Sequence, residues 1–455
     1  MAFIPVRFQI AVMLFWHCFV IYMVRVNLSV NILAMSVDTI QKSSGNKTDS
    51  IEKRVYHSHY VWTPQEESTL LGAYYYGYVA TSLFGGVICE RLGARIVSGV
   101  CLAINSVLTF LTPVATGVHF AFLFTIRFMN GMFAGIAFPG NQFLIAKWSP
   151  PNERAIFTAT IIGSSIGTLL TWVMSSLLSE AYGWDWAFYG AGFVSTIVMV
   201  FWFIIVFDEP ADHWYIREEE REYIQESMKG LIMRKRVWPP FKQVASSVPF
   251  YAAIVLHYGH MWNLYFQLTS SPKFFREVLH FRLSTAAFYA GLPYLVRSIT
   301  VFGFAAAADF IRRNNLLEIT FTRKFFCVFS HILPAFTLLI MAAFCSNAYI
   351  CLGLTTVCMG FNAAAVATNL INVQDLAPNF AATLYGIMNF FANTAGFLAP
   401  IMVAAITATK NTLVEWRLIF VINAFFYLIP GFLFIIFGSG ELQPWNNLQK
   451  PAAYD

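Results

Sequence analysis

Arg25 lies in an apolar run from Phe8 to Met35 that is long enough to cross a lipid bilayer. The run contains no Asp or Glu. A guanidinium group in hydrocarbon costs at least about 2.5–3.5 kcal/mol on insertion scales, so it persists only where it faces protein or water. We therefore expect a bundle of helices with a polar interior. The simplest source of the missing negative charge is a bound solute.

The composition extends this reading to the whole chain. Of its 455 residues, 58% are hydrophobic and 12% are charged, whereas soluble domains carry about 25% charged residues. This is the composition of a polytopic membrane protein. The net charge of +5 does not indicate nucleic-acid binding, because Lys and Arg lie at the ends of apolar segments and form no continuous patch. The first apolar run exceeds a signal-peptide core of about 7–15 residues, so it reads as the first spanning helix.

Twelve segments have roughly the 20 apolar residues that a spanning helix needs. They are 8–35, 68–89, 96–114, 119–146, 155–178, 185–207, 249–270, 284–308, 325–343, 347–371, 380–406 and 415–437. We therefore predict an all-α membrane protein with two pseudo-symmetric six-helix bundles, residues 1–207 and 248–437. A hydrophilic outer loop (38–67), a charged central loop (208–247) and a tail (438–455) complete the chain.

Lys and Arg predict the orientation. With both termini and the central loop in the cytoplasm, 17 of the 29 Lys and Arg residues lie on that side and 9 on the outer side, as the positive-inside rule requires. Asn46 then opens an N-glycosylation sequon in the outer loop.

The two halves also repeat. Pro151-Asn152 matches Pro378-Asn379 at an offset of 227 residues, and Trp186 matches Trp416 at an offset of 230. Parallel six-helix repeats are the plan of major facilitator transporters, which bind solute near the bilayer midplane between the halves.

One charged motif follows the second segment. The stretch from Gly86 to Arg95 resembles the major facilitator loop signature, in which a glycine allows close helix packing and charged residues form a cytoplasmic gate. The plainer alternative is a cluster of charges that only sets topology. The candidate gating residues are Gly86, Glu90, Arg91, Arg95, Glu153, Arg154 and Asp375.

Polar residues recur at helical spacing on the first, fourth, seventh and tenth segments, which line the cavity in major facilitators. Polar stripes facing lipid are costly, so we expect them to face the interior. For each Asn the alternative is a hydrogen bond between helices, worth about 0.6 kcal/mol. The candidate substrate-binding residues are Tyr22, Arg25, Arg127, Asn130, His260, Asn263, Asn369 and, less clearly placed on the eighth segment, Arg297.

At Arg25–Val30, Trp148–Arg154 and Gly440–Trp445 the chain resembles the anion:cation symporter family of sialin, the vesicular glutamate transporters and the sodium–phosphate cotransporters. The resemblance covers nearly the whole chain. It implies substrate arginines at Arg25 and Arg127. Where sialin and the glutamate transporters carry an acid after the fourth-helix arginine, this chain has Ala134. The sodium–phosphate branch also lacks that acid, and the chain looks most like insect members labelled as inorganic phosphate cotransporters.

The sequence thus indicates a secondary transporter of small anions, inorganic phosphate or organic, driven by sodium or the membrane potential. The alternatives are a proton-coupled exporter of sialic acid or acidic amino acids that uses His260, and a non-transporting receptor of the same fold. We expect no enzyme activity, no cofactor and no metal, because no P-loop, zinc spacing or catalytic set occurs. The seven cysteines suggest no disulfide framework. We expect a monomer in the plasma membrane.

Overall fold

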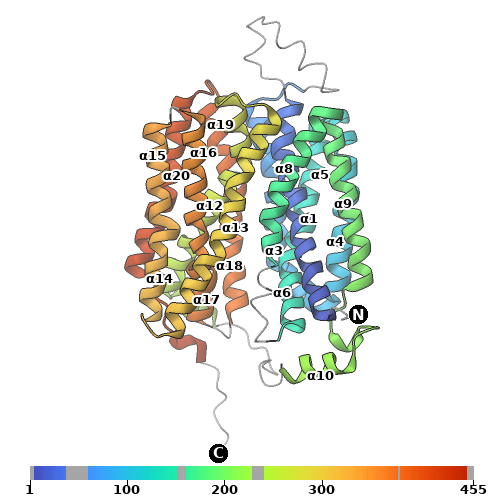
Figure 1. Ribbon diagram of the computed structural model, residues 1–455, viewed down its shortest axis with the longest axis vertical. Coiled ribbons are helices and arrows are strands. Elements are labelled where there is room, and N and C mark those ends of the chain that lie inside the picture. Colours follow the sequence, from blue (N-terminus) through green and yellow to red (C-terminus); the bar gives the residue numbers. More distant parts are fainter. Residues whose placement is uncertain are drawn as a thin grey trace, which may run out of the picture. The chain divides into compact units, whose positions relative to one another are not determined.

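The computed structural model describes residues 5–36, 60–150, 157, 160–227, 240–345, 347–377 and 380–447 (Figure 1). Within these ranges the chain is helical and contains no strand, only an isolated bridge between Ser36 and Tyr60. It divides into two compact units, residues 1–234 with 281–291 and residues 235–280 with 292–455.

The helices of the first unit precede the central segment. They are α1 (Val6–Met35), α3 (Pro64–Leu92), α4 (Ala94–Val118), α5 (Phe120–Gly135), α6 (Ala137–Trp148), α8 (Ile162–Tyr182) and α9 (Trp184–Ile205). The central segment contains a short 3-10 turn η3 (Pro210–Asp212) and α10 (Glu218–Ser227).

The second unit contains more irregular helices. They are α11 (Phe241–Ala245), α12 (Val248–Lys273), η4 (Phe274–Val278), α13 (Leu283–Arg313), α14 (Ile319–Cys327), η5 (Val328–Ile332), α15 (Leu333–Phe344), α16 (Ala348–Asn362), η6 (Ala363–Ala367), α17 (Asn369–Leu376), α18 (Ala381–Asn393), α19 (Ala395–Thr407), α20 (Leu413–Phe437) and η8 (Pro444–Asn447). Of these, α13 begins in the first unit and enters the second after Gly291.

The predicted all-α membrane fold is confirmed. Each of the twelve predicted segments coincides with one helix or with consecutive helices such as α5–α6 and α16–η6–α17. Ten of these runs are long and apolar enough to cross a membrane, and the more polar α3 and α12 complete the twelve. The breaks inside segments were not predicted, because apolar sequence continues through them.

Helix α3 shows how local sequence sets these ends. The Thr63 hydroxyl accepts a hydrogen bond from the backbone N–H of Glu66, and the Glu66 carboxylate accepts one from the backbone N–H of Thr63. This arrangement is a capping box. The helix ends at Gly93, whose φ of +86° disfavours any residue with a Cβ.

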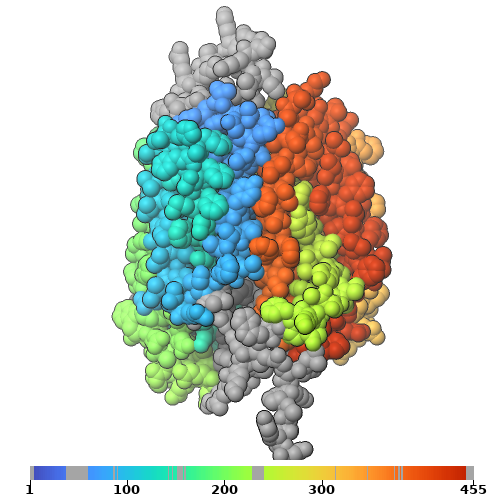
Figure 2. Space-filling view, turned by 180° about the vertical axis from the view of Figure 1, so that it is seen from behind, coloured from blue at the N-terminus to red at the C-terminus, as the bar shows by residue number. Residues whose placement is uncertain are grey.

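Glycines bring the helices of the first unit into close contact. A Cβ on Gly131 of α5 would lie 1.8 Å from the carbonyl oxygen of Tyr74, and one on Gly135 would lie 2.6 Å from that of Tyr78. This four-residue glycine spacing lets α5 pack directly on the backbone of α3. Figure 2 shows α3, α4 and α5 side by side, in blue to teal, on one face of this unit.

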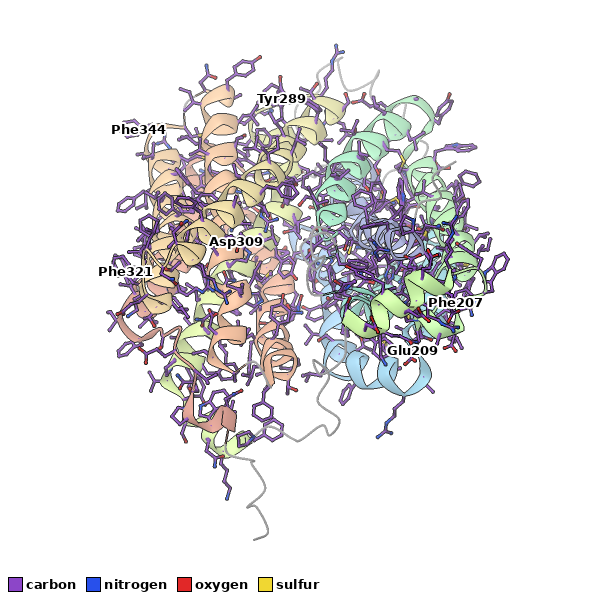
Figure 3. All side chains as sticks on the ribbon, turned by 60° about the horizontal axis from the view of Figure 1, so that its bottom comes forward. Phe207, Glu209, Tyr289, Asp309, Phe321 and Phe344 are labelled. Carbon is purple, nitrogen blue, oxygen red and sulfur yellow. A yellow bond between two sulfur atoms is a disulfide. The ribbon has the colours of Figure 1, made fainter. Side chains whose placement is uncertain are left out.

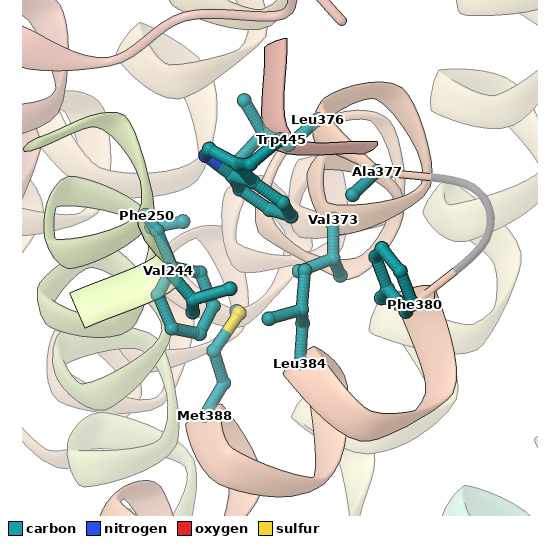
Figure 4. Close-up of a cluster of buried hydrophobic side chains, with 10 residues drawn as sticks. Val244, Phe250, Val373, Leu376, Ala377, Phe380, Leu384, Met388 and Trp445 are labelled. Atoms are coloured by element: carbon teal, nitrogen blue, oxygen red, sulfur yellow. The ribbon is translucent and has the colours of Figure 1, made fainter. Parts of the chain in front are cut away.

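Residues 438–447 pack onto the second unit. Trp445 is buried among side chains of α11, α12, α17 and α18 (Figure 4). Its ring stacks on Phe380 with centroids 6.5 Å apart. The backbone N–H of Gln443 donates to the Leu376 carbonyl at 2.8 Å. Residues 438–447 of the predicted tail therefore hold the ends of α17 and α18 together.

The outer faces carry large apolar side chains. Phe321 and Phe344 project from the second unit (Figure 3) and are 56% and 68% exposed. Exposed rings of this size are normal where the surrounding solvent is lipid.

The absence of disulfides was a wrong prediction. Cys345 and Cys351 form a disulfide across the short turn between α15 and α16. The sequence placed both at the ends of apolar segments. It did not show that the turn brings their Cα atoms to 5.4 Å, a distance that a disulfide spans.

Gly131→Ala tests the contact between α3 and α5. The added methyl group collides with backbone, which cannot move aside as a side chain can, so we expect a lower melting temperature. Gly303→Ala in α13 is the control, since nothing lies within 4 Å of its Cβ position. Thermal unfolding of purified protein in detergent measures both. Equal melting temperatures for the two variants would contradict the proposed packing.

Candidate functional site

Arg25 is buried in the first unit and surrounded by tyrosine rings. Its guanidinium carbon lies 4.6 Å from the ring centre of Tyr22, 4.8 Å from Tyr78, 5.3 Å from Tyr74 and 5.6 Å from Tyr75. We call these four rings the tyrosine cage. Their negative faces stabilise the cation, each by about 0.5–2 kcal/mol. The cage was not predicted, although Tyr74 and Tyr78, spaced by four residues, marked one face of α3.

Arg127 is also buried. It contacts one ring of the tyrosine cage and donates two hydrogen bonds to the backbone of α1. Its guanidinium carbon lies 5.3 Å from the centre of the Tyr74 ring. Its Nη1 donates to the Val24 carbonyl at 2.9 Å and its Nη2 to the Arg25 carbonyl at 3.0 Å. Its Nε and the amide oxygen of Asn130 are buried and have no hydrogen-bond partner among the described residues. Both lie on the same face of α5.

Hydrogen bonds between polar side chains of α1 and α8, which we call the polar seam, fix the rotation of α1 about its axis. Ser175 and Ser179 of α8 donate to the amide oxygens of Asn27 and Asn31 at 2.8 and 2.7 Å. The Trp172 indole N–H donates to Ser29 Oγ at 3.0 Å. These bonds turn one face of α1 toward α8, so Ser29 lies in this seam while Arg25 faces the tyrosines of α3.

The helices around the two arginines carry no acid near them. The sequences of α1 and α5 contain no Asp or Glu, and the acids of α3 lie in its first turn and at its end. Main-chain carbonyls and rings hold a guanidinium without neutralising its charge. The arrangement therefore suits an anionic ligand.

The second unit has a buried cluster of three histidines, with Arg297 and Asn362 beside it. The rings of His257 and His331 lie 6.3 and 6.4 Å from that of His260, and all three are fully buried. Arg297 Nε donates to the Asn362 amide oxygen at 2.9 Å. The Asn362 amide nitrogen lies 3.1 Å from His260 Nδ1 and 2.8 Å from the Tyr427 hydroxyl. We call the three rings the histidine cluster; only His260 was a sequence candidate.

Two irregular turns build this cluster. His331 lies in the π-helical turn η5, and Asn362 and Asn369 flank the 3-10 turn η6. The two turns are in contact. Asn369 thereby places its amide nitrogen 2.8 Å from His257 Nδ1. Turns of this kind inside helices often occur at functional sites.

Asn263, the remaining substrate candidate, lies outside the histidine cluster. Its amide donates to the carbonyls of Gly259 and Asn423 at 3.3 Å, joining α12 to α20. Among the described residues, no group of three or more His, Cys, Asp or Glu could hold a metal ion.

Asp375 forms a buried ion pair. Its carboxylate accepts from Arg323 Nε at 2.7 Å and from Arg323 Nη2 at 3.2 Å, while Arg323 Nη1 donates to the Ala367 carbonyl. This two-point geometry ties the end of α17 to α14. Arg323 was not a candidate, because its sequence context reads only as the end of a loop.

In the first unit, Arg95 donates its backbone N–H to Asp208 at 2.8 Å and a guanidinium N–H to the Phe203 carbonyl at 2.9 Å. Arg91 is exposed. The candidates Glu153, Arg154 and Asn46 lie outside the described residues, and of Gly86 and Glu90 only the helical backbone is described.

Residues 206–227 of the central segment pack against the start of α1, and we call them the clasp. Glu220 of α10 accepts hydrogen bonds from the backbone N–H groups of Val6 and Arg7, both at 3.0 Å, and pairs with the Arg7 guanidinium. A carboxylate here satisfies N–H groups that every helix start leaves open. Nearby, His213 packs between the rings of Phe207 and Tyr215 and bonds to the Ile205 carbonyl through Nε2 at 3.1 Å.

The chain matches the Major Facilitator Superfamily family model over residues 14–400. It is 33% identical to a Drosophila ananassae protein named "Putative inorganic phosphate cotransporter", over 95% of this chain and 93% of that protein. It is 30% identical to human vesicular glutamate transporter 2, over 98% of this chain and 76% of the relative.

Solved structures give the same fold at lower identity. A D-xylose-proton symporter superposes with a TM-score of 0.65 at 13% identity, covering 96% of this chain and 99% of the symporter. An inward-facing bacterial homologue of the lysosomal transporter Spinster gives 0.67 at 13% identity, covering 96% and 97%.

Asp375→Asn tests the buried ion pair. Removing one charge leaves Arg323 buried without its counter-charge, so we expect a loss of about 3–5 kcal/mol in stability. Glu218→Gln, at an exposed ion pair on α10, is the matched control and should change stability by less than about 1 kcal/mol. Denaturant unfolding measures both. Equal stabilities would show that the Arg323–Asp375 pair contributes little.

His213 predicts a pH effect on the clasp. Burial lowers the pKa of His213 below its usual 6.5, so the folded clasp binds a proton less readily than the opened segment. The stabilisation is complete above about pH 6.5 and is lost as pH falls from there toward the lowered value. Hydrogen exchange of residues 206–227, normalised to intrinsic rates, should rise at pH 5.5, and His213→Phe should remove that rise. Equal normalised exchange at pH 7.5 and 5.5 would contradict this.

Proposed function

The chain belongs to the major facilitator superfamily and, within it, to the anion:cation symporter family, and on that premise we propose that it is a secondary active transporter of inorganic phosphate or a small organic anion. Members of the superfamily are transporters and not enzymes, and this chain is an integral multi-pass membrane protein. The proposal concerns the solute, the driving force and the residues that act.

One observation carries the proposal. Arg25 and Arg127 share the Tyr74 ring, and no acid lies in α1, in α5 or in the middle of α3. Two buried cations this close repel each other, and an anion between or beside them relieves that repulsion. Planar guanidinium groups bind carboxylate and phosphate oxygens in pairs, which gives the anion a defined orientation.

The proposed roles follow from the contacts. Arg25 binds the anion from within the tyrosine cage, and Tyr22 belongs to that cage. Arg127 adds positive charge and holds α1 through its carbonyls, and Asn130 offers a buried amide. His260, Arg297, Asn263 and Asn369 are the proposed polar contributors of the second unit.

We propose that transport proceeds by alternating access, in which the bound anion is exposed first to one side of the membrane and then to the other. The ion pair of Asp375, the contacts of Arg95 and the charges of Glu90, Arg91, Glu153 and Arg154, with Gly86, form the proposed gate. We further propose a monomer in the plasma membrane with both termini in the cytoplasm, glycosylated at Asn46.

The coupling ion separates two candidate functions. Sodium or the membrane potential drives uptake in the first. Relatives named vesicular glutamate transporters, 30–31% identical over nearly the whole chain, favour a second, a proton-coupled exporter of acidic amino acids or sialic acid in a vesicle membrane.

Proteoliposomes test the proposal directly. Uptake of radiolabelled phosphate, L-glutamate and sialic acid is measured while sodium, pH and membrane potential gradients are imposed separately. Saturable uptake of one anion is expected with sodium or an inside-positive potential. Stimulation only by a pH gradient would select the second function. Saturable binding without flux would favour a receptor.

Arg25→Gln should reduce uptake by about 10–150-fold, the equivalent of one hydrogen bond to a charged group. Arg127→Ala should abolish uptake while leaving surface expression intact, because it removes charge and releases the carbonyls of Val24 and Arg25. Arg221→Gln, on the exposed face of α10, controls for loss of a positive charge. Uptake equal to wild type in the Arg25 or Arg127 variant would remove that residue from the site.

A further inference from the structure

The orientation of the Asn362 amide is fixed by its neighbour. Arg297 Nε can only donate a hydrogen bond, so the Asn362 atom facing it at 2.9 Å must be the amide oxygen. The amide nitrogen therefore faces His260 Nδ1 at 3.1 Å and the Tyr427 hydroxyl at 2.8 Å. Exchanging the two amide atoms would place N–H against N–H at Arg297.

This orientation fixes the tautomer of His260. Because the amide nitrogen of Asn362 donates, His260 Nδ1 must accept, and the ring proton lies on Nε2. His260 is fully buried, and its Nε2 has no hydrogen-bond partner among the described residues. A buried N–H group without an acceptor costs about 1–3 kcal/mol in folding free energy. An oxygen ligand that accepts from it therefore stabilises the folded state.

The neighbours of His260 oppose a second proton on its ring. Arg297 of α13 is the nearest fixed positive charge, and its guanidinium is joined to His260 through Asn362. The other titratable groups facing it are His257 on α12, His331 on η5 and Tyr427 on α20. None of them is an acid, so no described neighbour would stabilise an imidazolium.

The hydrogen-bond partner of His331 also fixes a donor. Its Nε2 lies 3.0 Å from the Leu256 carbonyl and must therefore donate, while Ser330 lies 2.8 Å from its Nδ1. His257 Nδ1 faces the amide nitrogen of Asn369 at 2.8 Å.

We propose that Arg297 and Asn362 are positioning residues that lock His260 as a neutral hydrogen-bond donor, and that its Nε2–H binds an oxygen of the transported anion. This rests on the proposed function. It adds that His260 takes up no second proton during transport and offers the anion a neutral hydrogen-bond donor. A coupling proton, if one moves, is carried by another group.

Side-chain mimics of the two ring nitrogens test the lock. His260→Gln places an amide N–H near the position of Nε2, whereas His260→Asn places it near Nδ1. Uptake by His260→Asn should fall at least about tenfold, and uptake by His260→Gln should exceed that of His260→Asn by at least about threefold. The ratio of His260→Gln uptake to wild-type uptake should be constant from pH 5.5 to 8. Taking the ratio removes the effect of the titration of phosphate itself, which is the same for both proteins. A proton carrier at this position would lose pH-driven uptake in both variants.

Asn362→Asp tests the positioning role. Its carboxylate accepts from both Arg297 and His260 Nδ1, so it stabilises the imidazolium that the amide opposes. Its uptake relative to wild type should therefore change at least about threefold across the same pH range. A purely structural role of Asn362 predicts a loss that is equal at every pH.

Nitrogen-15 solid-state NMR of labelled histidine, assigned by difference from His260→Gln, reads the tautomer without transport. At pH 7 the His260 signal should be that of a neutral ring with hydrogen on Nε2. A neutral ring with hydrogen on Nδ1, or an imidazolium, would contradict the proposed role of Arg297 and Asn362, even where the transport variants fold poorly. Wild-type liposomes that move no anion would instead overturn the proposed function, and the spectrum would still decide the tautomer.

Discussion

The positive charge of Arg25 is the constraint on which the first unit depends. Its charge cannot be left in hydrocarbon, and the described structure surrounds it with the four rings of the tyrosine cage. Each ring contributes about 0.5–2 kcal/mol, so together they are comparable with the insertion cost of about 2.5–3.5 kcal/mol or more. Quadrupoles stabilise a cation without cancelling its charge. The guanidinium can therefore be buried and still attract an anion. The glycine contacts of α5 and the seam between α1 and α8 keep rings and charge in register.

Twelve helices could be predicted because a bilayer imposes one length and one polarity on every span, and both are visible in a linear sequence. The departures from regular helix were not visible. The turns η5 and η6 lie in sequence that is as apolar as its surroundings, so composition gives no signal there. The ordered clasp of residues 206–227 was read as a charged loop, because its stability comes from contacts with α1 and α9 rather than from its own sequence.

The candidate site could be predicted in part, for the same reason. Arg25 and Arg127 stand out because each is a charge in an apolar helix. Tyr22 was a candidate, but the three cage tyrosines of α3 were hidden because they count as apolar residues there. His331 was not a candidate, because it lies inside the π-helical turn η5, where the regular helical spacing of α14 no longer indicates which face a residue occupies. Arg323 was hidden because pairing with Asp375 joins segments 52 residues apart.

The two units solve the burial of polar groups in different ways, and the difference bears on mechanism. The first retains net positive charge. In the second, the Arg297 guanidinium orients the Asn362 amide, which in turn orients the ring of His260. Chains of oriented donors polarise one another and resist titration, since changing one proton requires reorienting the whole chain. Such a relay suits recognition better than proton storage. Under the proposed function the arginines supply attraction for the anion, whereas the fixed neutral donor of His260 supplies a directed hydrogen bond.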